Sequence, residues 1–304
     1  MTDNNKILMC YGKTQFTPGR FLEDGFRGIG WHVDQVSDEI DFGRIDPAEY
    51  AAVLFVESPS KPNVRVNNIE LVNIPKLFWV NHGETRLETN VALARKYRPD
   101  LVLMAHSLHL AGKFPAPVRF FPFGMAADIF NSSEPLKGRP VDISFIGNTS
   151  PEDLYKKRRE ALRALKENFG ASRRLDFRAS VYLDSLAKAY RSAKIVINHS
   201  ADYVKSLNMR IFEGMGCGAL VITDFVPGME MLFEDRKHLV LFHSQEELLE
   251  RVDYYLNHPD EAQRIAAAGH RLLLGRHTYE HRAREIVELV RHHGAARTTQ
   301  ETVP

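Results

Sequence analysis

The 304-residue sequence contains only two cysteines, Cys10 and Cys217, and no CxxC pair. Two isolated thiols in apolar segments exclude a disulfide framework and a cysteine metal site, and they favour reduced, packed side chains. The sequence also has no run of eighteen apolar residues and no basic start followed by a long apolar stretch. We therefore expect neither a membrane span nor export, and we place the protein in the cytoplasm.

An excess of one charge is missing as well, because 40 Lys and Arg are balanced by 39 Asp and Glu. No global field exists to collect nucleic acid or anionic lipid, so neither is expected as a partner. Apolar residues make up 44% and charged residues 26%, which is typical of a globular chain. At this length two domains are expected.

Common cofactor and metal signatures are also absent. The sequence has no GxGxxG, no GxxxxGK[ST], no HExxH and no Asp-x-Asp. The usual dinucleotide, P-loop and zinc-protease sites are thereby excluded. His277 and His281 have the i, i+4 spacing of a zinc pair, but without HExxH we assign no metal. No cofactor is expected.

Short apolar runs that end in polar residues alternate with helix-length segments, first up to about residue 124 and again from about residue 141. This alternation predicts an α/β fold with two Rossmann-like parallel-sheet domains. The runs are KILMCY (6–11), WHVDQVS (31–37), AAVLFVES (51–58), KLFWVNHG (76–83), DLVLMAHS (100–107), VRFFPFG (118–124), DISFIGN (142–148), LDFRASV (175–181), KIVINHS (194–200), ALVITDF (219–225) and HLVLFHS (238–244).

The segment NSSEPLKGRP (131–140) shows neither strand nor helix periodicity, and we interpret it as the linker between the domains. We expect an N-terminal domain over 1–135, a C-terminal nucleotide-binding domain over 136–290 and a flexible tail over 295–304. Ser150, Pro151 and Asp153 predict a capped start for the helix that follows.

The stretch KSLNMRIFEGMGCGALVITDF (205–225) predicts a helix between two buried strands. Asn208 is a good N-cap, so the first-turn N–H groups can receive a diphosphate at the strand ends. Further into the helix, Glu213 can accept two hydrogen bonds from a vicinal diol; the competing interpretation is a surface acid on an amphipathic helix. Lys205 and Arg210 are candidate phosphate-binding cations, or else solvated loop charges.

Three glycines complete the stretch. Gly214, Gly216 and Gly218 remove bulk where the helix and strand must approach, and Gly218 can also supply a left-handed helix stop.

From Asp142 to about Val290 the sequence resembles the nucleotide-binding half of GT-B glycosyltransferases, closest to the CgeB-like (spore maturation) branch of the GT4-type retaining enzymes. The matching segments are FIGN (145–148), VYLDSLAKAYRSAKIVIN (181–198), NMRIFEGMGCGALVITD (208–224), MLFEDRKHLVLFHSQEEL (231–248) and AAAGHRLLLGRHTYEHR (266–282), and FFPFGMAADIF (120–130) is similar to the hinge. The resemblance implies a GT-B fold whose two domains face a central cleft, with the acceptor on the N-terminal side.

The resemblance also implies roles for residues. A glutamate matching Glu213 holds the nucleotide ribose, and a second glutamate eight positions earlier contacts the donor sugar; that position is Lys205 here. Val181 and Tyr182 match the segment that lines the nucleobase, although a core tyrosine is the competing explanation.

Three further positions are candidates. Asn148 ends the first strand of its domain and is a candidate phosphate or sugar contact, whereas Lys156 to Arg159 read as a solvated helix face. Gly12 and Lys13 follow the first strand of the chain, where the backbone can approach a diphosphate. His82 matches an active-site histidine of GT4 enzymes, although with thirteen histidines a structural role competes.

These features predict a hexosyltransferase-type enzyme that moves a sugar from a nucleoside-diphosphate donor to a hydroxyl of a glycan, protein or small molecule. Retention at C1 follows from the resemblance, and the lack of Asp-x-Asp favours metal-independent transfer. A catalytically silent GT-B paralogue that binds nucleotide sugar or assembles on a cell or spore surface layer is the main alternative. A sugar-nucleotide epimerase and an unrelated two-domain binding protein are the others.

Overall fold

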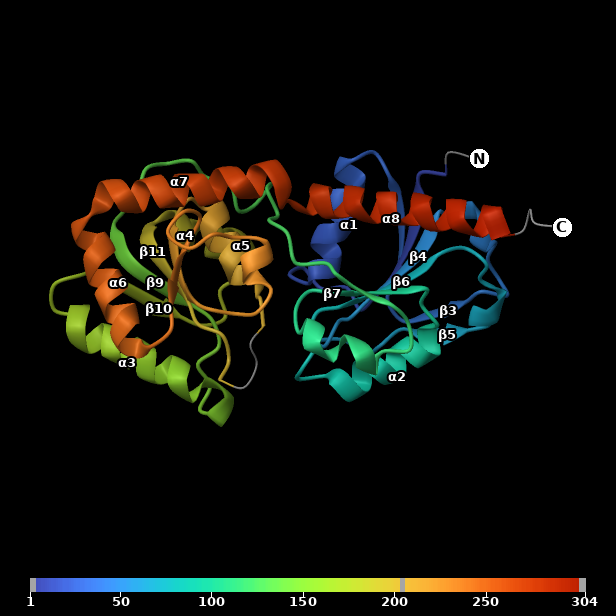
Figure 1. Cartoon of the computed structure of the whole chain (residues 1–304), viewed down its shortest axis with the longest axis horizontal. Helices are drawn as coiled ribbons and strands as arrows, with labels where there is room; N and C mark the ends of the chain where they lie inside the picture. The colour runs from blue at the N-terminus through green and yellow to red at the C-terminus, as the bar shows by residue number, and fades with distance from the viewer. Residues whose placement is uncertain (1–3, 203–205, 301–304) are drawn as a thin grey trace. The chain divides into compact units, whose positions relative to one another are not determined.

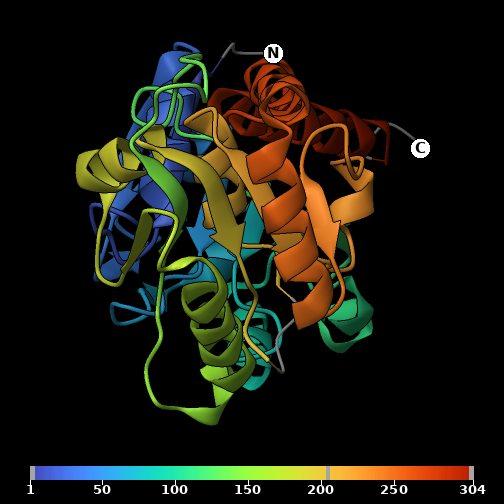
Figure 2. The same cartoon turned by 90° about the vertical axis from the view of Figure 1, so that its left-hand side faces the viewer.

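The computed structural model describes residues 4–202 and 206–300. Contacts divide the chain into two compact units: unit 1 comprises Met1–Phe123 and Tyr279–Pro304, and unit 2 comprises Gly124–Thr278. Each unit is an α/β structure built around its own parallel sheet (Figures 1 and 2).

Unit 1 contains a six-stranded sheet in the order β2-β1-β4-β6-β7-β8, and all of its pairings are parallel. Each of the six predicted runs forms one of these strands. The elements are β1 (Lys6–Cys10), α1 (Pro18–Gly28), β2 (His32–Val36), β4 (Ala52–Val56), β6 (Lys76–Val80), α2 (Leu87–Tyr97), β7 (Leu101–Met104), β8 (Val118–Phe120) and α8 (Tyr279–Gln300). A small parallel pair, β3 (Glu39–Asp41) with β5 (Arg65–Asn67), was not predicted.

Helices cover both faces of the unit 1 sheet. On one face, α2 contributes Leu93, Ala94 and Tyr97 to an apolar cluster with alternate residues of β1, β4, β6 and β7. On the other face α1 packs along α8 (Figure 1), where a Cβ at Gly25 would lie 2.5 Å from the Tyr279 carbonyl oxygen. Coverage of both faces explains why the strands are continuous apolar runs.

Unit 2 contains a five-stranded parallel sheet in the order β10-β9-β11-β12-β13. All five predicted runs are confirmed as strands. The elements are β9 (Val141–Ile146), α3 (Lys156–Phe169), β10 (Leu175–Arg178), α4 (Leu183–Arg191), β11 (Ala193–Asn198), α5 (Met209–Gly216), β12 (Leu220–Asp224), β13 (Val240–Phe242), α6 (Gln245–Asn257) and α7 (Pro259–Arg276).

The helices of unit 2 lie on two sides of this sheet. Helices α3 and α6 contact each other and share an apolar cluster with side chains of β9, β11 and β12. Helices α4 and α5 contact each other and the same strands from the opposite side (Figure 1). A Cβ at Gly214 would lie 2.9 Å from Val221 and 3.1 Å from Val196, so glycine permits the close approach of α5.

The end of α5 follows the sequence prediction. Gly218 has φ +68°, the left-handed conformation expected of a helix stop, and a Cβ there would lie 2.4 Å from the Ser132 carbonyl oxygen. Cys10 and Cys217 are free and buried, as predicted for packed thiols.

Three boundaries differ from those expected. The units divide at Phe123 and Gly124 rather than at residue 135, and α8 joins unit 1 because it packs along α1. Helix α8 also extends to Gln300, into the predicted tail, whereas residues 301–304 lie outside the described part of the chain. The predicted cap of α3 is wrong: the short 3-10 helix Asp153–Tyr155 precedes α3, which begins at Lys156 without a side-chain cap.

Among the described residues, no helix is both long and apolar enough to cross a membrane.

Candidate functional site

The strand order of unit 2 reverses direction between β9 and β11. From β9 the chain crosses to β10 on one side, and it then returns to β11 on the other side. In open parallel sheets ligands bind at the carboxyl ends of the strands flanking such a switch point. The polar residues that follow β9 and β11 are therefore the first place to look for a site.

Arg210, near the start of α5, is held at this switch point. Its Nε donates to the Ile146 carbonyl oxygen over 2.8 Å, and its Nη1 donates to Oδ1 of Asn198 over 2.6 Å. The guanidinium also lies 4.9 Å from the centroid of the Phe145 ring. A Cβ at Gly147 would lie 2.3 Å from Nη2, so glycine is required where the cation rests.

Helix α5 begins as the sequence predicts. The Asn208 side chain accepts a hydrogen bond of 3.1 Å from the backbone N–H of Arg210, which confirms it as the N-cap. The remaining first-turn N–H groups and the partial positive charge of the helix end make this position favourable for an anion.

Glu213 lies one turn further along α5 and is half-buried. Within the described residues its carboxylate has no hydrogen bond or ion pair, although burial raises its pKa to about 7 against the opposing charge of Arg210. A carboxylate kept in an unfavourable place without a partner is the signature of a group reserved for a ligand.

Arg158 was missed by the sequence analysis, which placed residues 156–159 on a solvated helix face. Lys156 and Lys157 are exposed as predicted, but the prediction is wrong for Arg158, which is only 5% exposed. It donates from Nη1 to the Asn148 carbonyl oxygen over 2.7 Å, and from Nε and Nη2 to the His199 carbonyl oxygen over 3.0 and 2.7 Å. Arg158 thus ties together the two switch-point loops, and burial beside Arg210 lowers its pKa to about 10.

Three other predicted residues lie around this edge. The Asn148 side chain accepts from the backbone N–H of Ser150 over 2.9 Å, so its amide turns back on its own loop. Val181 and Tyr182 precede α4, and Tyr182 is 50% exposed, which excludes the competing core position. Lys205 lies outside the described residues.

Two predicted residues follow β1 in unit 1, also beside a reversal of strand order, between β1 and β4. Gly12 is buried, and a Cβ there would lie 2.3 Å from Cβ of Lys61, so its close neighbour is a side chain. The Lys13 ammonium pairs with the fully buried carboxylate of Glu23 over 2.8 Å. Their predicted approach to a diphosphate stays a prediction.

His82 lies at the end of β6 in unit 1, beside a buried acid that the sequence analysis did not single out. Glu57, at the end of β4, accepts the backbone N–H groups of Asn81 and His82, each over 2.7 Å. Its Oε1 lies 3.6 Å from Nδ1 of His82 and 3.1 Å from Nε of Arg86. The His82 side chain remains 44% exposed.

The charge of Glu57 is stabilised by these neighbours. Burial alone would raise its pKa, but the His82 imidazole and the two backbone N–H groups outweigh burial and hold the pKa below its usual range. An ionised Glu57 favours the His82 tautomer with a proton on Nδ1, which leaves Nε2 as the outward acceptor.

The same edge of unit 1 has unused hydrogen-bonding capacity. Within the described residues, buried polar atoms without a hydrogen-bond partner include Ser58 Oγ, Asn81 Oδ1, Glu84 Oε2 and Asn90 Oδ1. Native structures leave few such atoms, so water or a polar ligand that reaches them is expected to complete their hydrogen bonds. His106 is not one of them: it bonds Asn81 O and Ser107 Oγ, and burial lowers its pKa to about 4.

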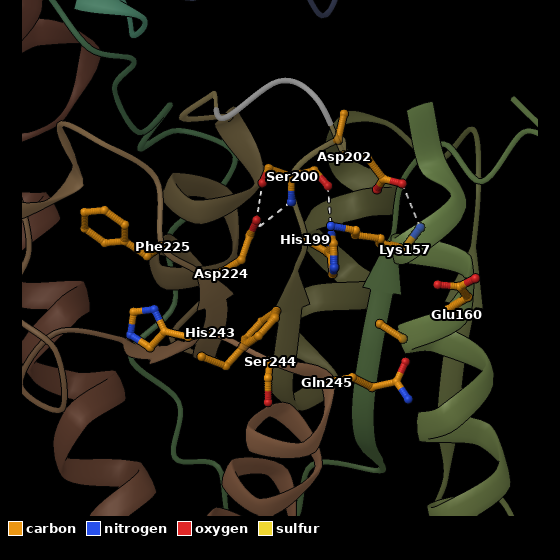
Figure 3. Close-up of a pocket in the computed structure, with 13 residues that line it drawn as sticks. Lys157, Glu160, His199, Ser200, Asp202, Asp224, Phe225, His243, Ser244 and Gln245 are labelled. Carbon is orange, nitrogen blue, oxygen red and sulfur yellow. Dashed lines mark hydrogen bonds between the residues drawn. The ribbon is translucent and has the colours of Figure 1, made fainter. Parts of the chain in front are cut away.

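The end of β11 also serves the opposite side of the unit 2 sheet, because successive residues of a strand point to opposite faces. Asn198 faces α5 and binds Arg210, whereas the next residue, His199, lines a pocket of about 460 Å³ beside α3 and α6 (Figure 3). Ser200, in the loop that follows β11, donates its N–H and hydroxyl to the Asp224 carboxylate at the end of β12.

The two parallel-sheet units form the GT-B fold of glycosyltransferases, and solved structures share it. Anabaena HepE in complex with UDP and glucose is 13% identical, with a TM-score of 0.61 over 94% of this chain and 99% of that one. Sucrose-phosphate synthase from Thermosynechococcus elongatus is 13% identical, with a TM-score of 0.61 over 96% and 99%. An alpha-glucosyltransferase in complex with UDP and a 13-mer DNA is 12% identical, with a TM-score of 0.66 over 94% and 98%.

Residues 142–288 match the family described as "Glycosyl transferase-like". This range begins in β9 and covers nearly all of unit 2, including Arg158, Arg210 and Glu213. No curated protein matches the chain in sequence. The fold shared with the solved structures confirms the predicted GT-B fold class.

Proposed function

We propose that the protein is a nucleotide-sugar-dependent glycosyltransferase that moves a hexosyl group from a nucleoside-diphosphate donor to a hydroxyl acceptor. The observation that carries the proposal lies on one short helix: a capped N-terminus and Arg210 stand beside Glu213, which has no side-chain partner in the part of the chain that the structure describes. An anion-binding end followed by a free carboxylate suits a diphosphate joined to a ribose diol.

In this mechanism the residues of unit 2 stabilise the leaving group. Negative charge grows on the diphosphate as the C1–O bond breaks, and Arg210 together with the α5 N-terminus would stabilise that charge. A hydrogen-bond donor of the protein that is already oriented can lower the activation barrier by about 3 kcal/mol. Lys205, outside the described residues, would add a second cation.

We assign the acceptor side to the polar edge of unit 1. His82, with Nε2 facing outward, would accept a hydrogen bond from a substrate hydroxyl, and Glu57 would hold the ring. The unpartnered buried atoms of residues 57–90 offer further hydrogen bonds to a polyhydroxyl acceptor.

The finer assignments are parts of the same proposal. We propose transfer with retention, in which the donor phosphate helps to take the acceptor proton, because the sequence suggests no covalent nucleophile. We further propose metal-independent transfer without a cofactor, since Arg210, Lys205 and the α5 N-terminus together can balance the diphosphate. The CgeB-like subfamily and the cytoplasmic location stay predictions.

Calorimetric titration of the full chain with UDP, GDP, TDP and ADP tests the proposal, followed by donor hydrolysis assays with the matching nucleotide sugars. UDP is the first probe because HepE and the alpha-glucosyltransferase are described in complex with it. Binding with turnover supports the enzyme, and retained anomeric configuration by NMR with full activity in EDTA supports the finer assignments.

Other outcomes point elsewhere. Binding without turnover would identify the silent paralogue, and inversion at C2 of the donor sugar would identify an epimerase. A chain that binds none of the four nucleotides has no donor site of this kind.

A further inference from the structure

The pocket beside α3 and α6 is not used by the proposed donor site. It lies at the carboxyl ends of β11, β12 and β13 and at the beginnings of α3 and α6 (Figure 3), on the opposite side of the sheet from helix α5. Its volume of about 460 Å³ falls within the range of small-molecule sites. The charges and rings of its lining residues indicate which class of ligand fits it.

The charges of the lining do not suit an anion. Among the lining residues that the structure describes, Glu160, Asp202 and Asp224 contribute carboxylates, and Lys157 is the one lysine or arginine. A phosphate or diphosphate would meet more negative than positive charge and is disfavoured.

These carboxylates are also poor partners for a cation. Both oxygens of Asp224 accept from Ser200, and Asp202 Oδ2 accepts the backbone N–H of Lys157 over 2.9 Å at the positive end of α3. Glu160 is exposed at the margin. The lining therefore offers carboxylate acceptors that are already partly occupied by backbone and hydroxyl donors.

Two acceptors of the pocket lining receive no hydrogen bond from the described residues. Asp202 Oδ1 is buried and has no hydrogen-bond partner within the described residues. His199 Nδ1 lies 2.8 Å from the Ser200 carbonyl oxygen, which can only accept, so Nδ1 carries a proton, and in the tautomer protonated there Nε2 is an acceptor. A ligand rich in O–H donors would satisfy both.

Aromatic rings provide the apolar part of the pocket. The Phe225 and His243 rings lie 6.3 Å apart at an angle of 35°, and the His199 ring lies 5.9 Å from the ring of buried Phe242. Figure 3 shows Phe225 and His243 on one side of the pocket and Lys157 and Glu160 on the other. Flat rings beside acceptors that can receive hydrogen bonds from ligand hydroxyls match a sugar, which has an apolar C–H face and a polar rim.

We propose that this pocket binds a neutral sugar residue and is a second carbohydrate site, separate from the donor site on α5. Such a site would hold one residue of a glycan substrate while another residue of the glycan reacts. It requires no chemistry in the pocket, only hydrogen bonds to Asp202, His199 and Gln245 and ring contacts.

Saturation-transfer NMR on the full chain tests this, with methyl glycosides of glucose, galactose, mannose and N-acetylglucosamine as probes. We expect at least one glycoside to bind, and we expect Phe225→Ala and His243→Ala each to weaken it about tenfold, the effect of losing one good ring contact. Gln245→Ala, an exposed position at the beginning of α6, should weaken it without a folding defect.

Met231→Ala is the matched control, because it removes a large apolar side chain of unit 2 that is 54% exposed and outside the pocket. The control should bind the glycoside like the wild type, and all variants should keep wild-type UDP affinity and thermal midpoint. Absence of glycoside binding, insensitivity to the pocket variants, or displacement by spermidine or UDP would each overturn the proposal. Loss of UDP binding by the wild-type chain would instead count against the donor site.

Discussion

Arg210 and Asn198 form a hydrogen bond of 2.6 Å that joins the start of α5 to the end of β11. Asn198 is fully buried, and its Nδ2 donates to Oγ1 of Thr223 on β12 over 2.8 Å. The cation is therefore oriented by a network anchored in the sheet before any ligand arrives. Such preorganisation lets a charged group stabilise a developing charge without first paying for its own ordering.

Glu213→Gln should make the protein more stable and worse at binding nucleotide. The pKa of Glu213 is raised from an ordinary 4.5 to about 7, so the folded chain holds the proton more tightly than the unfolded chain between these values, and stability falls as pH rises through them. This difference is worth about 3 kcal/mol at most, and partial exposure reduces it to about 1–2 kcal/mol.

Urea unfolding at pH 8 and at pH 4.5 measures the effect. We expect the variant to be more stable at pH 8, with the advantage vanishing near pH 4.5. Nucleotide affinity of the wild type should fall below about pH 7, where Glu213 gains its proton, and that of Glu213→Gln should be low and independent of pH. Equal affinities in the two proteins would refute the ribose role.

Gly147→Ala should disturb the donor site more than the fold. The added Cβ would lie 2.3 Å from Nη2 of Arg210, the movable end of a long side chain, so the guanidinium shifts while the sheet stays intact. Losing one charge-assisted hydrogen bond costs about 1.5–3 kcal/mol, or about tenfold to a hundredfold in nucleotide affinity.

Gly275→Ala is the control for this variant, since a Cβ there meets nothing within 4 Å. Calorimetry should show wild-type affinity for the control and weak binding for Gly147→Ala, with thermal midpoints close to each other. A Gly147→Ala protein that binds nucleotide normally would remove Arg210 from the phosphate site.

In Glu57→Gln, the free energy of unfolding should depend less on pH in the acid range than it does in the wild type. The folded pKa of Glu57 lies below its ordinary value of 4.5, so the ionised group stabilises the fold above that pH, and this contribution is lost as pH falls through the folded pKa. Wild type should lose more stability than Glu57→Gln between pH 6 and pH 3 in urea titrations. Parallel curves would show that the fold does not lower the pKa of Glu57.

His82→Ala should leave stability nearly unchanged, because the side chain is 44% exposed and Glu57 keeps Arg86 and two backbone N–H groups as neighbours. Surface changes of this kind alter stability by about 0.5 kcal/mol or less. Transfer activity with the donor identified by calorimetry should nevertheless fall about 10²- to 10⁴-fold, the usual contribution of a positioned proton-transfer group. Undiminished turnover would assign His82 a structural role.

Much of the fold was predictable because its signals are local. Strand-length apolar runs between helical segments predict a parallel sheet wherever both faces are covered, and all eleven predicted runs form strands of the two main sheets. Asn208 as an N-cap and Gly218 as a helix stop depend on backbone groups within a few residues, so their short sequence context was sufficient.

The weaker predictions concern charged residues and chain ends. Arg158 stands in a basic run, and nothing near it in sequence indicates that Asn148 and His199 will place carbonyl oxygens around it. The partnership of Glu57 with His82 spans 25 residues and arises because β4 and β6 are neighbours in the sheet. The start of α3 differed because the 3-10 helix Asp153–Tyr155 precedes it, and the hydroxyl of Ser150, the predicted cap, donates to Glu152 over 3.3 Å.

The sequence by itself determined which segments become strands and helices and where α5 begins and ends, since periodicity and capping act over one or two turns. Only the tertiary structure decided which strand ends meet, which arginines are buried and which acids remain without partners. These properties depend on strand order and on packing between residues far apart in the chain, and no local pattern encodes either.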